Sequence, residues 1–272
     1  IGKIMNKEIP KVSLIVPIYN VEKFLEKCLD SLVAQTLDGM EIILVDDNST
    51  EKKDRLLELV QERKDQLHFF QNEPGKNSAG RCRNIGLEHA RGQWLVFADA
   101  DDFFLPGFYD VVRKYFDSEY DIVWFVPTSL DLKTGQPSNR HVRYEKMVRE
   151  FMERKDPESE VRLRYHQESP WSKMIRRRIV CENHIQFDTT MVANDIMFSI
   201  RCAFAAHLVE ASEEKIYCVT KQGGTLTTAV NVEKFYVRLQ VFLDKYQFLK
   251  SRLGKTEWKA VDLLGRPYIK LA

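Results

Sequence analysis

Three carboxylates directly follow an apolar segment of the chain: Asp99, Asp101 and Asp102 come after residues 94–98. A continuous apolar run of this length predicts a strand that is buried on both faces. Two aspartates at i and i+2 beyond a strand end can bind one hard divalent cation, which prefers oxygen ligands and accepts phosphate oxygens as the rest. The same residues could instead form an Asp-rich turn that caps a helix over residues 105–116.

A second acidic pair, Asp46 and Asp47, follows a predicted strand at 41–45, and residues 17–20 end a third strand at 12–16. The carboxyl ends of parallel strands meet at one edge of a sheet, where ligands bind. These segments therefore predict one shared crevice, in which Tyr19 could stack on a nucleobase and Asp47 could accept hydrogen bonds from a base or a ribose.

Two arginines, Arg81 and Arg83, begin the helix predicted over residues 78–89. Guanidinium groups bind phosphates and carboxylates through paired N–H donors. So many carboxylates in one crevice cost electrostatic energy unless a cation or hydrogen-bond donors are present. We expect the two arginines to pair with phosphate or with the aspartates.

The first half of the chain alternates strand-like and helix-like patterns at a spacing that predicts a doubly wound, mostly parallel α/β sheet flanked by helices. The expected strands are 12–16, 41–45, 67–70, 94–98 and 122–126. One helix is expected directly after Asn20, and three more are expected at about 52–63, 78–89 and 108–116.

The pattern changes after Pro127. Residues 128–168 are charged and weakly periodic, so we expect an elaborated, partly mobile region there. Order is expected again at 170–173, in an apolar helix near 196–206, in an edge strand at 217–220 and in an amphipathic helix from Val232 onward.

The composition favours a folded enzyme and excludes several classes. The chain has 272 residues, of which 44% are hydrophobic, and its 41 basic and 40 acidic residues give no electrostatic case for nucleic acid. Five scattered cysteines without CxxC spacing indicate reduced thiols in the cytoplasm. No membrane span or signal peptide is evident. Basic runs such as 176–178 are typical of solvated faces, with a peripheral contact at the inner face of the membrane as the alternative.

Nucleotide-binding motifs of two common classes are absent from the sequence. Residues 75–80 have the G-x-x-x-x-G spacing of a P-loop, but Arg81 and Cys82 stand where lysine and serine or threonine are required. No G-x-G-x-x-G follows any predicted strand, which removes the dinucleotide fingerprint.

Five motifs in consistent order resemble those of family 2 glycosyltransferases with the GT-A fold, of the bacterial polysaccharide or cell-surface glycan type. The match extends over about residues 10–125 and continues more loosely to about residue 225. The motifs are VSLIVPIYN (12–20), SLVAQT (31–36), LVDDNS (44–49), RNIGL (83–87) and FADADD (97–102).

The resemblance implies a leader at 1–10, a catalytic domain at 11–225 and a helical extension at 226–272. The catalytic domain would divide into a nucleotide-sugar-binding half at 11–126 and an acceptor-side half at 127–225. It also implies a nucleotide-sugar donor, usually a UDP-sugar, and Mg²⁺ or Mn²⁺. The residues expected at the nucleotide are Pro17, Tyr19, Asn20, Asp47, Arg83 and Asp99, and those expected at the metal are Asp101 and Asp99.

Asp195 corresponds to the catalytic base of the family's Glu-Asp motif, and Asn194 replaces the usual glutamate. A cap on the following helix is the alternative role for Asp195. Asp188 is the next candidate for the base. Trp171 matches an aromatic residue near the donor or acceptor sugar, although a core tryptophan fits equally well.

The resemblance therefore implies an inverting, metal-dependent glycosyltransferase of the hexosyltransferase type that acts on a glycan or a lipid-linked acceptor. One alternative is a sugar nucleotidyltransferase, which needs a Gly-rich basic loop after the first strand, where this chain has residues 17–21. The other is a nucleotide-sugar-binding module without turnover.

Overall fold

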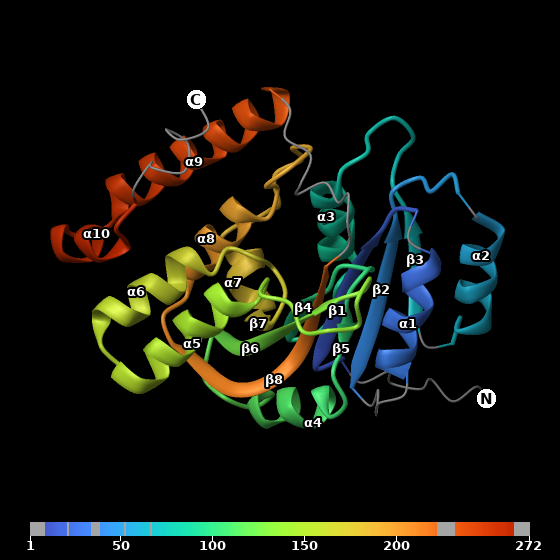
Figure 1. Cartoon of the computed structure of the whole chain (residues 1–272), viewed down its shortest axis with the longest axis horizontal. Helices are drawn as coiled ribbons and strands as arrows, with labels where there is room; N and C mark the ends of the chain where they lie inside the picture. The colour runs from blue at the N-terminus through green and yellow to red at the C-terminus, as the bar shows by residue number, and fades with distance from the viewer. Residues whose placement is uncertain are drawn as a thin grey trace, which may run out of the picture.

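The computed structural model of the chain describes residues 9–20, 22–33, 39–51, 53–65, 67–221 and 232–263. Within these residues, a single eight-stranded sheet has the order β3-β2-β1-β4-β7-β6-β8-β5 and is flanked by helices (Figure 1). The predicted α/β architecture is therefore confirmed. The predicted leader, the boundary near residue 225 and the end of the extension fall largely outside the described residues.

One half of the sheet is parallel, as predicted, and consists of β1 (Val12–Ile18), β2 (Met40–Asp46), β3 (Leu67–Gln71) and β4 (Trp94–Phe97). The register pairs Ile18 with Asp46, so β1 and β2 end level with each other. Their polar extensions consequently meet at the carboxyl edge of the sheet.

Helices cover both faces of this parallel half. Side chains alternate along a strand, and in β1 Leu14 packs with α1 (Glu22–Val33) and α2 (Lys53–Glu62), whereas Ile15 packs with α3 (Ala79–His89). A Cβ atom at Gly86 of α3 would lie 2.4 Å from Ile15 Cγ2. The absence of a side chain at this glycine therefore lets α3 lie directly on β1.

The other half of the sheet is mixed. Strand β7 (Lys173–Arg176) runs antiparallel to both β4 and β6 (Ile122–Asp131), and β8 (Val209–Lys221) runs parallel to β6. The two-residue strand β5 (Phe103–Phe104) pairs with Phe103 opposite Cys218. The strand predicted at 217–220 is present as part of β8, but its predicted edge position is wrong, because β8 lies between β6 and β5.

The region over 128–168, which was expected to be elaborated and partly mobile, consists largely of regular elements. Strand β6 continues to Asp131, and two helices follow, α5 (Val142–Arg154) and α6 (Pro157–His166). Asp156 caps α6 by accepting a hydrogen bond from the Ser159 amide at 2.8 Å. Ion pairs one turn apart, such as Arg154–Glu150 at 2.9 Å, stabilise the helices and give the sequence its charged appearance.

The remaining helices include the predicted apolar and amphipathic ones. A short helix α4 (Phe108–Val112) continues as a 3₁₀ turn (Arg113–Tyr115), and α7 (Arg177–Glu182) follows β7. Helix α8 (Ile196–Ala205) packs against α9 (Val232–Arg252), and α10 (Lys255–Val261) packs against α6 (Figure 1). None of the helices in the described part of the chain combines the length and apolar character of a membrane span.

Candidate active site

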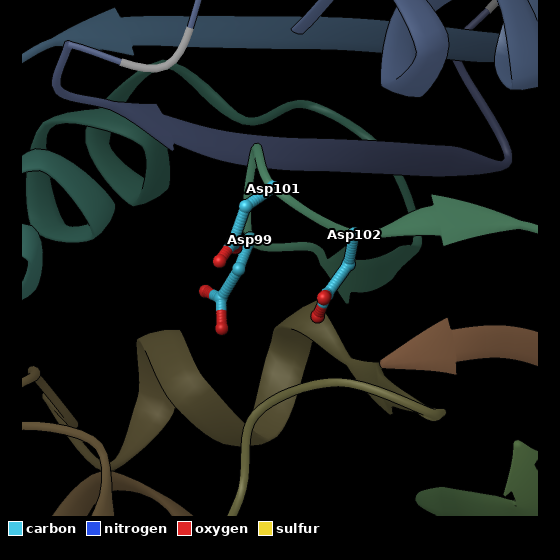
Figure 2. A group of neighbouring side chains, drawn as sticks. All are labelled: Asp99, Asp101 and Asp102. Carbon is cyan, nitrogen blue, oxygen red and sulfur yellow. The ribbon is translucent and has the colours of Figure 1, made fainter. Parts of the chain in front are cut away.

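The acidic loop after β4 gathers three carboxylates at the carboxyl edge of the sheet. One oxygen of each of Asp99, Asp101 and Asp102 lies within 4.8 Å of the others (Figure 2). Figure 2 shows Asp99 and Asp101 extending to the same side of the loop, with Asp102 beside them. The loop thus joins the sheet at the place that the sequence predicts.

Asp102 holds this loop to β8. Its Oδ2 accepts a hydrogen bond from the Tyr217 hydroxyl at 2.8 Å, and its Oδ1 accepts one from the Thr220 amide at 2.7 Å. The Tyr217 oxygen in turn accepts a hydrogen bond from the Asp99 amide at 2.9 Å. Only 4% of Asp102 is exposed. Asp102 therefore serves to hold the loop to the sheet, whereas Asp99 and Asp101 are half-buried.

Burial and neighbouring carboxylates raise the pKa of Asp101 and of Asp102. Burial raises the pKa of Asp101 to about 6, the charge of Asp99 adds to the rise, and Arg140 opposes it. Burial also raises the pKa of Asp102 well above its ordinary range, with Asp101 and Asp99 contributing. A hard divalent cation would relieve this repulsion, and its preferred oxygen ligands are present. The donor set fits Mg²⁺ or Mn²⁺.

Arg83 links the acidic loop to the segment that carries Asp195. Its Nη2 donates to Asp99 Oδ1 at 2.6 Å and its Nη1 donates to Asn194 Oδ1 at 3.0 Å. Arg83 is only 5% exposed, so the structure places it against Asp99 in the interior and not on an open surface. Asn194, where the family usually has glutamate, keeps an oxygen acceptor for this arginine and loses the negative charge.

A glycine explains why residues 111 positions apart can meet in this way. A Cβ atom at Gly80, in the first turn of α3, would lie 1.9 Å from the Asp188 carbonyl oxygen and 3.1 Å from Asn194 Cβ. The start of α3 therefore packs backbone to backbone against the segment that ends in Asn194 and Asp195.

Asp195 occupies the N-cap position of α8, but its side chain makes no capping hydrogen bond. The alternative role as a helix cap is therefore not supported. Burial raises the pKa of Asp195 to about 6, Arg83 opposes the rise, and Asp99 and Glu168 add to it. A half-buried carboxylate with no capping task and an elevated pKa is suited to accept a proton.

The predicted nucleotide residues meet at the ends of β1 and β2. Asn20 has a positive φ of 50°, and its Oδ1 accepts hydrogen bonds from the amides of Thr50 at 2.9 Å and Glu51 at 3.1 Å. The Asn20 amide donates to Ser49 Oγ at 3.0 Å. Asn20 thus joins the two strand-end loops at the carboxyl edge of the sheet.

Tyr19 and Asp47 differ in exposure. Tyr19 is 52% exposed, so it does not pack under the neighbouring helix, and Pro17 beside it is half-buried. Asp47 is buried, and its Oδ1 accepts a hydrogen bond from Asn72 Nδ2 at 2.7 Å. Tyr19 is therefore free to cover a flat ligand, while Asp47 has one oxygen tied to the protein.

Trp171 lies in an aromatic stack. Its ring lies 5.8 Å from Tyr217 at an angle of 15° and 5.0 Å from Tyr144 at an angle of 78°, and the residue is 7% exposed. Within this stack, the Tyr217 hydroxyl is the group that reaches the acidic loop. A sugar contact by Trp171 stays a prediction, and its role in the core is evident.

Sequence reasoning missed the residues that fix the site from a distance, namely Asn72, Tyr217 and Thr220. Tyr217 and Thr220 each contact a residue of the acidic loop across 118 positions in the chain. Their types are ordinary for a strand, so no local signal marks them.

The sheet, the strand-end loops and the acidic loop together define a glycosyltransferase of the GT-A class. The chain belongs to glycosyl transferase family 2, whose sequence model matches residues 13–182, more than half of the chain. The family and fold predictions are therefore confirmed.

Two curated relatives illustrate the similarity. The chain is 30% identical over 223 residues to the uncharacterized glycosyltransferase EpsJ of Bacillus subtilis. This aligned region covers 80% of this chain and 63% of EpsJ. It is 34% identical over 95 residues to a poly(ribitol-phosphate) beta-glucosyltransferase of Bacillus spizizenii. This shorter aligned region covers 34% of this chain and 15% of that protein. The chain thus spans less than two thirds of each relative.

Solved structures share the fold. S. aureus TarS 1–349 in complex with UDP-GlcNAc superimposes with a TM-score of 0.70 at 22% identity, covering 92% of this chain and 70% of TarS 1–349. The mannosyltransferase PcManGT from Pyrobaculum calidifontis, in complex with GDP-Man and Mn²⁺, gives a TM-score of 0.58 at 18% identity, covering 94% of this chain and 68% of PcManGT.

Proposed function

We propose that this protein is an inverting, metal-dependent glycosyltransferase that moves a hexosyl group from a UDP-sugar to a hydroxyl of a glycan or lipid-linked acceptor. The observation that carries the proposal is Asp195, a carboxylate with a pKa of about 6 and no capping hydrogen bond, linked through Asn194 and Arg83 to Asp99.

The donor is a nucleoside-diphosphate sugar. Tyr19 offers an exposed aromatic ring for a base, and Asp47 lies beside it at the strand ends. The solved structures of the same fold carry UDP-GlcNAc in one case and GDP-Man in the other, which supports this class of donor. We favour uridine because of the family resemblance.

Asp101 and Asp99 would hold the divalent cation, and Asp102 would keep their loop in place. When bound, such a cation neutralises negative charge on the departing diphosphate. The buried, mutually repelling carboxylates support this assignment, as does the Mn²⁺ in the PcManGT structure.

Asp195 would accept the proton of the acceptor hydroxyl while that oxygen forms a bond to the anomeric carbon. The bond from this carbon to the diphosphate oxygen breaks on the opposite face, so the configuration inverts. A pKa of about 6 leaves Asp195 mostly ionised at neutral pH and still basic enough to take a proton. Arg83 would keep the segment of Asp195 aligned with Asp99.

The acceptor belongs to cell-surface glycan synthesis in this proposal, which the name of the poly(ribitol-phosphate) glucosyltransferase supports. We place the reaction in the cytoplasm, with a peripheral contact at the inner face of the membrane. Trp171 is proposed to support the acceptor or donor sugar from within its aromatic stack.

A thermal-shift panel tests the proposal. UDP, UDP-glucose, UDP-GlcNAc, GDP and GDP-mannose are added with and without Mn²⁺, because ligands that bind the folded state raise its melting temperature. UDP and UDP-sugars should raise it, more strongly with Mn²⁺. If no nucleoside diphosphate changes the melting temperature in either condition, the proposed donor is wrong. Hydrolysis of the bound UDP-sugar then separates an enzyme from a binding module.

A further inference from the structure

The chain turns sharply after β6, and this turn carries a basic residue, Arg140. The turn is built by backbone hydrogen bonds from the Asp131 amide to the Gln136 carbonyl at 2.8 Å and from the Ser138 amide to the Ser129 carbonyl at 3.0 Å. His141, the next residue, has its Nδ1 2.7 Å from Ser129 Oγ. Arg140 therefore projects from a fixed turn.

Arg140 lies beside the acidic loop through Thr220. Its Nη1 donates a hydrogen bond to the Thr220 carbonyl oxygen. Thr220 Oγ1 donates to the Asp101 carbonyl at 2.9 Å, and the Thr220 amide donates to Asp102 Oδ1 at 2.7 Å. One residue of β8 thus holds both the loop and the arginine. The positive charge of Arg140 acts on Asp101, whose pKa it lowers against the effect of burial.

The two arginines near the acidic loop differ in what they can reach. Arg83 is 5% exposed and donates hydrogen bonds to Asp99 and Asn194, so its positive charge acts inside the protein. Arg140 is exposed. A guanidinium group has five N–H donors, and the hydrogen bond to Thr220 takes one of them. Arg140 can therefore bind an anion that approaches Asp101.

We propose that Arg140 binds the diphosphate of the nucleotide-sugar donor, on the face of the acidic loop that Thr220 holds. This inference rests on the proposed function, because it requires a nucleoside diphosphate beside Asp101. A guanidinium group pairs well with phosphate oxygens, and its fixed position places positive charge where negative charge grows as the sugar departs. Arg140 thereby offsets the repulsion between the diphosphate and the three carboxylates.

Isothermal titration with UDP and with uridine, each with and without Mn²⁺, tests this assignment in Arg140→Met. The substitution keeps an unbranched side chain and removes the charge. We expect the Kd for UDP to rise roughly 10- to 100-fold, as for the loss of a charge-assisted hydrogen bond. The Kd for uridine, which has no phosphate, should stay within about twofold of wild type.

Two further variants complete the test. Arg113→Met removes an exposed arginine that pairs with Asp110 at 3.4 Å, away from the site, and should leave the Kd for UDP unchanged. Arg140→Lys keeps the charge without the planar fork and should recover part of the UDP affinity. An unchanged Kd for UDP in Arg140→Met, or equal losses for UDP and uridine, would overturn the assignment while the proposed function stands. Wild-type protein that binds no UDP would overturn both.

Discussion

Two aspartates of the site differ in their hydrogen bonds, and these bonds set their tasks. Asp102 accepts hydrogen bonds from Tyr217 and Thr220, so it serves the fold. Asp195 makes no capping hydrogen bond although it stands at the start of α8. At the scale of single residues, Asp195, which makes no capping hydrogen bond, is therefore the carboxylate to substitute when the chemistry is tested.

Asp195→Asn should leave the melting temperature and the UDP affinity near wild type, because asparagine is nearly isosteric and is tolerated at helix starts. The amide cannot accept the acceptor proton, so transfer should fall roughly 100-fold or more. Measured kcat for transfer, with UDP binding as the control, checks this. Transfer close to wild type would make Asp188 the next candidate for the base.

The pH profile of transfer follows from the pKa of Asp195, which burial raises to about 6. A general base must be deprotonated, so kcat should be level above about pH 7 and fall about tenfold per pH unit below pH 6. Asp101 titrates in the same range, and a bound cation holds it ionised, so the profile is measured at saturating Mn²⁺. If the residual transfer rate of Asp195→Asn shows the same inflection with pH, the inflection belongs to another group.

Asp101→Asn tests the metal site. The amide removes a buried charge that Asp99 repels, so the melting temperature without metal should stay level or rise. A divalent cation loses a charged ligand, and the additional rise in melting temperature that Mn²⁺ gives with UDP should largely disappear. If Mn²⁺ acts as it does on wild type, the cation binds elsewhere.

Helix α3 shows at the scale of elements how packing sets the site. Gly80 and Gly86 lie in the same helix, one against the carbonyl of Asp188 and the other against the side chain of Ile15. Gly86 fixes α3 on the sheet, and Gly80 fixes the segment of Asn194 and Asp195 on α3. Both glycines therefore allow close packing, but only Gly80 packs against the segment that carries Asp195.

Gly80→Ala and Gly86→Ala form a matched pair. Both gain helix propensity, but both introduce overlap worth about 1–3 kcal/mol of destabilisation. The overlap at Gly80 is with backbone 1.9 Å away, so the segment that ends in Asp195 must move. Thermal melts should show both variants destabilised, and kcat below the melting range should fall only for Gly80→Ala. If Gly80→Ala and Gly86→Ala have equal kcat values, the packing of α3 at Gly80 does not affect catalysis.

The predictability of elements follows from their burial. Strands β1, β2 and β4 can be located from sequence within a few residues, because burial on both faces gives continuous apolar runs. Helices α5 and α6 were missed, because pairs such as Arg162–Glu158 fill their exposed faces with charge. Asp47, Asp99 and Asp101 could be located from the strand-end rule. Tyr217 and Thr220 could not, since only the folded sheet order brings β8 to the loop.

Across the whole molecule, helix α9 packs against α8 and is no detached appendage. Lys245 of α9 is 2% exposed and donates to Glu168 Oε1 at 2.6 Å. Glu168 precedes Trp171 by three residues, and its charge contributes to the raised pKa of Asp195. The proposed division into a catalytic domain and an extension stays a prediction, and this ion pair joins the two.

Lys245→Met should reduce the free energy of unfolding by up to about 3 kcal/mol, because it leaves Glu168 mostly buried without its partner. The double variant Lys245→Met with Glu168→Gln removes the stranded charge and should regain part of that loss. Urea denaturation of the two variants measures the difference. If the double variant is as unstable as the single one, the loss comes from the packing of α9 and not from the ion pair.

The hydrogen bonds from Tyr217 and Thr220 to the acidic loop also bear on when this loop can take its folded position during translation. A nascent chain that has reached residue 126 contains Tyr19, Asp47, Asp99 and Asp101 but not the strand that fastens their loop. Contacts across 118 positions form only after the intervening chain has been made. We therefore expect residues 12–126 alone not to hold the acidic loop in its folded position, and the proposed donor site to be complete only after β8 has been translated.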